Sequence, residues 1–167
     1  MITQRKNAAH EEVYIALNDL VRINNERIAC YDQVRTLILN TRFENLFNDI
    51  IAEGKRFNEK LSIEINGLSS TSKTGKYVPG SIHRAWQDLR IAFTGKTPNA
   101  LLSYCEYTEE LAQLAYGAAL NVSGETSRSC AAIIEEQWHS LKQILSKLKQ
   151  SHEVRTYAVR PAHAYFN

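Results

Sequence analysis

The segment from Leu101 to Leu120, LLSYCEYTEELAQLAYGAAL, constrains the fold most, because its apolar residues recur at helical spacing. At about 100° per residue, one stripe of the helix collects Leu101, Cys105, Ala112, Ala115, Tyr116 and Ala119. Glu109 lies at the edge of this stripe. A buried carboxylate is costly unless it is paired. The segment therefore predicts a helix that carries an acidic residue, together with its partner, into a protein core.

Three further segments show the same periodicity. The expected long helices cover residues 8–39, 42–66, 98–120 and 127–157. A break at Asn40 and Thr41 is so short that the first two helices form an antiparallel hairpin. Thr41 to Glu44 matches a capping box at the start of the second helix, and Gly67 is a candidate C-terminal cap. Repeated long helices without strand patterns predict an all-α protein.

The starts of the last two helices carry capping residues. Thr97 precedes Pro98, a combination typical of a helix N-terminus. Thr126 or Ser127 is suited to cap the fourth long helix. Each of these positions follows a segment that lacks helical periodicity, so the sequence itself marks where the chain turns.

A long connection over residues 67–97 separates the two hairpins and contains a shorter helical segment, SIHRAWQDLRIAFTG. A link of about thirty residues can travel the length of a bundle, so the second and third long helices are expected to run parallel. The predicted architecture is a four-helix bundle of two antiparallel hairpins joined by a crossover with a short extra helix. Residues 1–167 are expected to form a single domain.

Composition narrows the class of protein. Hydrophobic residues make up 44% of the chain and the formal net charge is only +2, which favours a packed globule without a nucleic-acid partner. No apolar run reaches the roughly 18 residues of a membrane span, and the polar N-terminus lacks a secretory signal. We expect a cytoplasmic protein without a membrane partner. The basic residues of the crossover are interpreted as a solvated loop rather than an anion site; they are Lys73, Lys76, His83 and Arg84.

The three cysteines, Cys30, Cys105 and Cys130, form no C-x-x-C pair. An odd count without paired spacing predicts neither a disulfide framework nor a zinc site. Cys105 lies on the apolar stripe described above, where a cysteine usually acts as a small buried hydrophobic residue.

Each long helix brings one polar residue to a similar depth, and the four residues are Asn24, Glu53, Glu109 and Gln137. Counted from the helix starts, their positions predict one polar layer near the middle of the bundle. Glu26 is about 200° from the apolar face of the first helix and is expected to point outward. The Glu136-x-x-His139 sequence also lies opposite its helix's apolar face, so we interpret it as a chance match.

Three stretches, LNDLVRINNERIACYDQV, SIHRAWQDLRIAFTGK and CEYTEELAQLAYGAAL, together with the glutamine that follows them, resemble an uncharacterised bacterial family. This family, domain of unknown function 2383, is placed among the ferritin-like four-helix bundles. The resemblance extends roughly from Leu17 through Leu148. It implies the ferritin-like arrangement of two hairpins and one long crossover, which the loop lengths indicate independently.

The resemblance also implies a metal interpretation. Ferritin-like di-iron sites use a Glu from each of two helices and a Glu-x-x-His from each of the other two. Carried over to this chain, the tentative metal ligands are Asn24, Glu53, Glu109 and Gln137. Asn24 stands where a glutamate is expected, while Arg56 and Ser140 occupy the histidine positions. The set is therefore a degenerate version of the family site, and iron or manganese are the metals it implies.

Two functions remain open from the sequence. The favoured one is a non-enzymatic structural or interaction role, in which the four residues bond to one another with help from Arg27 or water. The hydroxyls of Tyr31 and Tyr116 are expected to join this layer. The alternative is a di-iron or di-manganese carboxylate oxidoreductase that oxidises ferrous iron or handles peroxide. A DNA-associated mini-ferritin would need a basic tail that the sequence lacks, and a homodimer is the expected partner state.

Overall fold

The computed structural model describes residues 1–69, 78–89, 95 and 97–158, with side chains up to residue 153. Every regular element in these ranges is a helix. The five helices are α1 (Ile2–Leu37), α2 (Thr41–Ser69), α3 (Ser81–Leu89), α4 (Pro98–Ser123) and α5 (Arg128–Ala158). The all-α prediction is confirmed, and so is a short helix between the two pairs of long ones. Lys73 and Lys76 lie outside the described residues.

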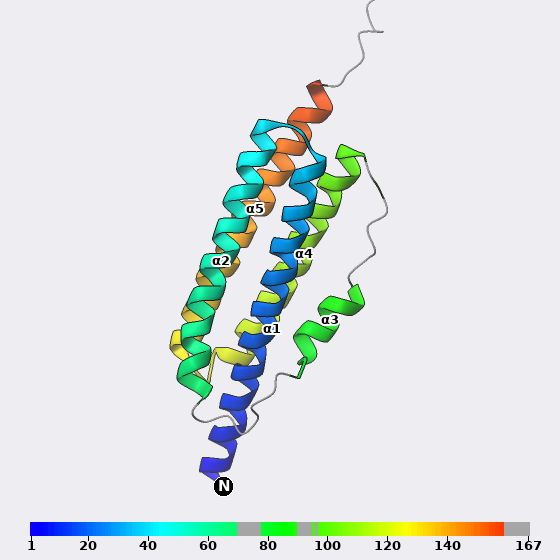
Figure 1. The fold of residues 1–167 in the computed structure, drawn as a ribbon. Coiled ribbons are helices and arrows are strands. Elements are labelled where there is room, and N and C mark those ends of the chain that lie inside the picture. The colour runs from blue at the N-terminus through cyan, green and yellow to red at the C-terminus, as the bar shows by residue number, and fades with distance from the viewer. Residues whose placement is uncertain (70–77, 90–94, 96, 159–167) are drawn as a thin grey trace, which may run out of the picture.

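The long helices form two antiparallel hairpins, α1 with α2 and α4 with α5 (Figure 1). The hairpins pack through α1 against α4 and through α2 against α5. In Figure 1, α2 and α4 both descend while α1 and α5 both ascend, so the second and third long helices are parallel as predicted. α3 lies outside the four-helix core, against α1 and α4.

Several predicted helix ends are wrong by a few residues. α1 begins at Ile2 and ends at Leu37, so it starts before residue 8 and stops short of residue 39. Asn40, not Thr41, caps α2, because its side-chain Oδ1 accepts a hydrogen bond from the Arg42 N–H at 3.0 Å. Gly67 does not end α2, which continues to Ser69. An exposed glycine costs a helix only about 1 kcal/mol, too little to force an end.

The other two predicted caps are confirmed. The Thr97 side chain accepts a hydrogen bond from the Ala100 N–H at 3.2 Å, with Pro98 in the first turn of α4. The Ser127 hydroxyl accepts one from the Cys130 N–H at 3.3 Å. α4 runs to Ser123, slightly beyond the expected residue 120, and a tight turn leads into α5.

One apolar core runs along the bundle between the four long helices. Its largest fully buried apolar and aromatic residues are Leu17, Leu20, Ile23, Tyr31, Phe47, Leu61, Leu101, Leu102, Tyr116, Ile134 and Leu141. Gly54 lets α1 and α2 approach closely, because a Cβ atom built there would lie 3.0 Å from Ile28 Cγ1. Among the described residues, no helix is long and apolar enough to cross a membrane.

Candidate functional site

A buried ion pair between α1 and α4 lies near the middle of the core. The Arg27 Nη2 atom donates to both carboxylate oxygens of Glu109, at 2.8 and 3.0 Å, and Arg27 Nε donates to Glu109 Oε1 at 3.0 Å. The two side chains are 1% and 0% exposed. Two-point contact between a guanidinium and a carboxylate is the strongest arrangement available for such a pair. The partner required by a buried Glu109 is therefore an arginine.

Tyr31 completes the surroundings of this carboxylate. Its hydroxyl donates to Glu109 Oε1 at 2.8 Å. Burial and the negative charge of Glu109 raise the pKa of Tyr31 well above its ordinary value, so the hydroxyl keeps its proton and stays a donor. Burial, the largest single influence, lowers the pKa of Arg27, but the charge of Glu109, the hydrogen bond to it and the neighbouring tyrosines together outweigh burial, and the pKa is raised. Arg27 therefore remains charged in the core.

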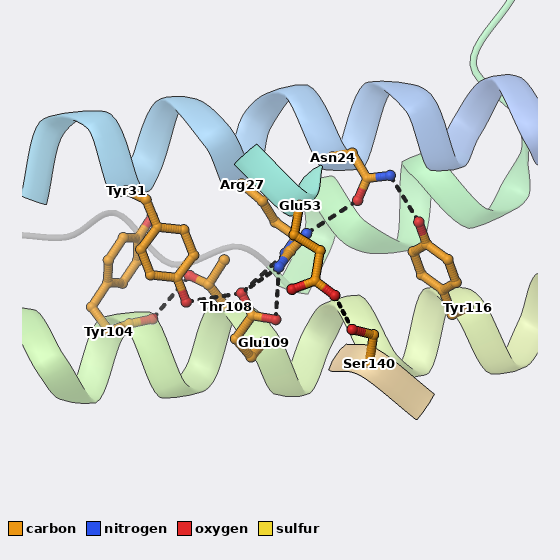
Figure 2. A network of polar contacts seen from close by, with 9 residues as sticks. All are labelled: Asn24, Arg27, Tyr31, Glu53, Tyr104, Thr108, Glu109, Tyr116 and Ser140. Carbon is orange, nitrogen blue, oxygen red and sulfur yellow. Dashed lines mark hydrogen bonds and ion pairs between the residues drawn. The ribbon is translucent and has the colours of Figure 1, made fainter. Parts of the chain in front are cut away.

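A chain of hydrogen bonds continues from Arg27 across all four long helices. Arg27 Nη1 donates to Asn24 Oδ1 at 3.2 Å, and Asn24 Nδ2 donates to the Tyr116 hydroxyl at 2.8 Å (Figure 2). Tyr116 donates in turn to Gln137 Oε1 at 2.8 Å. Gln137 Nε2 ends the chain at the Phe57 carbonyl oxygen, at 3.2 Å. Each buried polar group passes a hydrogen bond to the next, which is how such a network avoids a desolvation penalty.

We call the six residues of this arrangement the core network: Asn24, Arg27, Tyr31, Glu109, Tyr116 and Gln137. The predicted polar layer is confirmed for Asn24, Glu109 and Gln137, which this network connects. The expected roles of the tyrosine hydroxyls are confirmed as well. Arg27, expected only to assist the layer, bonds to both Glu109 and Asn24 at its centre.

Glu53 lies beside the core network with a different partner. It is half-buried, points toward the same layer in Figure 2, and its Oε1 accepts a hydrogen bond from the Ser140 hydroxyl of α5. Burial raises the pKa of Glu53, and the nearby positive charges of Arg27 and Arg56 oppose that rise. Ser140, the residue at a position where a ferritin-like site has histidine, is thus a hydrogen-bond partner.

The geometry fits a di-metal centre poorly. The Glu109 oxygens that would bind a metal accept hydrogen bonds from Arg27 and Tyr31, and the guanidinium brings a positive charge to the position a cation would need. Asn24 and Gln137 are likewise engaged with Tyr116. Among the residues that the structure describes, no group of three or more His, Cys, Asp or Glu side chains could hold a metal ion.

A second polar contact, between α1 and α3, was not expected from the sequence. Glu26 was expected to point to solvent, but its Oε2 accepts from Trp86 Nε1 at 2.8 Å and its Oε1 lies 2.9 Å from His83 Nε2. His83, expected in a solvated loop, is only 5% exposed. The expectation failed because α3 covers the face of α1 that looks polar in sequence. The helical spacing of hydrophobic residues along α1 does not indicate that another helix packs on this face.

Asp19 fixes the N-terminal end of α3 from the same face of α1. This fully buried carboxylate accepts hydrogen bonds from the backbone N–H groups of Gly80, at 2.9 Å, and His83, at 3.1 Å. Free N–H groups at a helix start attract negative charge, so Asp19 acts as a cap supplied by another helix. We call Asp19, Glu26, His83 and Trp86, with the Gly80 N–H, the α3 contact.

The outward orientation of Glu136 and His139 is confirmed. Both side chains are exposed, and Glu136 pairs with Lys60 on the surface at 2.7 Å. His139 Nδ1 lies 2.8 Å from the Glu135 carbonyl oxygen of its own helix. The literal Glu-x-x-His sequence in α5 therefore lies on the opposite side of the helix from the core network.

Comparison with known proteins gives a family but no relative of known function. A protein-family model described as "Domain of unknown function (DUF2383)" matches residues 12–122. This range contains the Arg27–Glu109 pair and the whole α3 contact, whereas Gln137 and Ser140 lie beyond it. No curated protein and no solved structure matches the chain.

Proposed function

The chain belongs to the family of the domain of unknown function DUF2383, and we propose that it is a ferritin-like bundle with a non-enzymatic structural or interaction role. In this proposal the core network stands where related bundles hold two metal ions. The observation that carries it is the two-point Arg27–Glu109 pair, because it satisfies the central carboxylate with a fixed cation.

The helix arrangement supports the ferritin-like part of the proposal. Two antiparallel hairpins with a parallel second and third helix are the order expected for one long crossover in such bundles. The network reaches α1, α4 and α5 by side chains and α2 by a backbone carbonyl, so it links all four helices at one level. A fully satisfied polar network of this kind fixes the register of the helices, and it engages both oxygens of the Glu109 carboxylate.

Metal content tests the proposal against the oxidoreductase alternative. Full-length protein purified without chelator, and again after aerobic loading with ferrous iron or manganese, would be analysed by mass spectrometry. We expect no stoichiometric metal in the wild type. The matched variant Glu53→Gln/Glu109→Gln removes both carboxylates while keeping their size. Stoichiometric metal in the wild type that disappears in this variant would overturn the proposal.

Thermal unfolding gives a second readout, which does not require a bound metal to remain on the protein during purification. A ligand that binds only the folded state raises the unfolding midpoint, and the rise grows with the logarithm of its concentration above Kd. We expect the midpoint of the wild type to be the same with and without added manganese. A concentration-dependent rise absent from Glu53→Gln/Glu109→Gln would favour a metal centre.

We also propose that the protein acts as a homodimer. Several large apolar side chains are exposed on the long helices, including Ile63 on α2 and Leu114 on α4, at 69% and 64%. Light scattering of the full-length protein decides the question, and a monomer at micromolar concentration would contradict it.

A further inference from the structure

Two cysteine thiols meet where α1 packs against α4. The thiol of Cys105, which is 0% exposed, shares a hydrogen bond with the thiol of Cys30. Both cysteines are reduced thiols. Cys30 follows Arg27 by three residues and Cys105 precedes Glu109 by four, so the thiols lie about one helical turn from the ion pair. No sequence pattern predicts this contact, because the two residues are far apart along the chain.

Cys30 is the thiol that solvent can reach. It is half-buried and lines a cavity of about 260 Å³ between α1 and α4, together with Glu26, Val34, Leu101 and Tyr104. A water molecule takes about 30 Å³ of liquid volume, so the cavity admits a small oxidant. Cys105 lies behind it in the core. One accessible thiol in contact with one buried thiol is the arrangement of a reactive cysteine and a resolving cysteine.

We propose that Cys30 and Cys105 are a reversible disulfide site, oxidised by hydrogen peroxide. The Cys30 sulfur attacks one peroxide oxygen, the O–O bond breaks, and the products are a Cys30 sulfenic acid and water. The Cys105 sulfur then attacks the Cys30 sulfur. The S–O bond breaks and the departing hydroxide takes the Cys105 proton as water. In total, two thiols and one peroxide give one disulfide and two waters.

The surroundings of the two thiols explain why Cys30 reacts with peroxide first and Cys105 reacts second. The hydrogen bond to Cys30, burial, and the negative charges of Glu109 and Glu106 raise the pKa of Cys105 well above its ordinary value. A thiol held in its protonated form is a poor first nucleophile toward peroxide, but it is suited to resolve a neighbour that is already oxidised. The resulting disulfide would join the two hairpins covalently beside the core network. This inference does not depend on the proposed function.

Cys130 provides an internal control. It lies in α5, where its thiol contacts Glu64 of α2 at 3.4 Å, and it belongs to a different part of the core. Trypsin places the three cysteines on separate peptides, covering residues 28–35, 97–128 and 129–142. Peptide mapping can therefore assign any crosslink without ambiguity.

The test uses the full-length protein, reduced, freed of reductant and treated with a small excess of hydrogen peroxide before free thiols are alkylated. We expect a crosslink between peptides 28–35 and 97–128 that reductant reverses. It should persist in Cys130→Ser and be lost in Cys30→Ser and in Cys105→Ala. Peroxide should also raise the unfolding midpoint of the wild type and of Cys130→Ser, but not that of Cys30→Ser.

Three outcomes would overturn the inference. One is a Cys30 that accumulates as sulfinic acid while Cys105 remains open to alkylation after unfolding. Another is a crosslink that joins two copies of the chain or involves Cys130. The third is oxidation that leaves all three thiols free under conditions that fully oxidise an exposed model thiol. Circular dichroism of each variant first establishes that it is folded, and Cys30→Ser, at the half-buried position, carries the conclusion if Cys105→Ala does not fold.

Discussion

The core network and the α3 contact lie on two faces of α1. They differ in which groups bind their carboxylates. In the core network, Glu109 meets a full opposite charge and a hydroxyl, all inside the four-helix core. In the α3 contact, Asp19 meets two backbone N–H groups, and Glu26 meets His83 and Trp86 at the edge of the bundle. α1 is therefore covered on both faces. One face sets how the bundle is assembled, and the other holds an added helix in place.

This comparison predicts different consequences for losing a carboxylate. A buried charge without a partner is among the most costly defects in a core, whereas a lost helix cap affects mainly the helix that it caps. Changes in the core network should lower global stability. Changes in the α3 contact should loosen α3 and leave the four long helices intact.

Removing the charge of Glu109 should have the largest effect. Glu109→Leu leaves Arg27 charged and unpaired in the core, so we expect it to lower the free energy of unfolding by about 3–5 kcal/mol. The double variant Arg27→Met/Glu109→Leu removes both charges and should lose much less, because apolar side chains of similar size can replace a buried pair. Urea unfolding followed by circular dichroism measures both. Equal losses of unfolding free energy in the single and double variants would show that Glu109 does not stabilise the protein by pairing with Arg27.

Removing the cap of α3 should have a smaller and local effect. Asp19→Ala leaves the Gly80 and His83 N–H groups without their acceptor, and we expect it to cost about 1–3 kcal/mol of local stability. Hydrogen exchange measured by mass spectrometry should speed up in Ser81–Leu89 and remain slow in α4. The matched variant Asp19→Asn retains one acceptor oxygen and should lie between wild type and Asp19→Ala. Faster hydrogen exchange in all four long helices would contradict the expectation that the Asp19 cap stabilises α3 alone.

Glu53 offers a pH-dependent test at the edge of the core network. Its pKa is raised above the ordinary value of 4.5, so the folded state holds the Glu53 proton more tightly than the unfolded state does. This contribution favours folding at low pH and is lost as the pH rises through the folded pKa. At neutral pH, Glu53→Gln should therefore be slightly more stable than wild type, by less than about 1 kcal/mol.

The difference between Glu53→Gln and wild type should disappear as the pH falls below the ordinary value of 4.5, because both side chains are then neutral. Urea midpoints measured from neutral to acidic pH follow the difference. A Glu53→Gln variant that is less stable than wild type at neutral pH would mean that the charged form is favoured by Arg27 more strongly than burial opposes it.

The smallest effect is expected on the surface of α5. Glu136→Ala/His139→Ala removes the literal Glu-x-x-His and an exposed ion pair with Lys60. Such pairs contribute little, so the free energy of unfolding should change by no more than about 0.5 kcal/mol. This double variant is the baseline against which the Glu109 and Asp19 variants are compared. A loss of several kcal/mol would place these side chains in a contact absent from the structure.

Much of the candidate site could be predicted because helix geometry fixes the direction of each side chain around its own axis. Asn24, Glu109 and Gln137 were expected in one layer from their depth and phase alone, and the structure connects them. Glu53 reaches the same level but bonds to Ser140. Which partner a side chain finds depends on the rotation of two helices relative to each other, and a single helix does not determine that rotation.

The sequence by itself determined the helical class, the two hairpins, the parallel second and third long helices, and the need to bury a carboxylate. Those features follow from periodicity, caps and loop lengths, which are local properties of the chain. Tertiary structure alone decided that Arg27 lies at the centre of the network, that α3 buries His83, and that Cys30 meets Cys105. These contacts join residues distant in sequence, and their energy depends on which helix faces lie against each other.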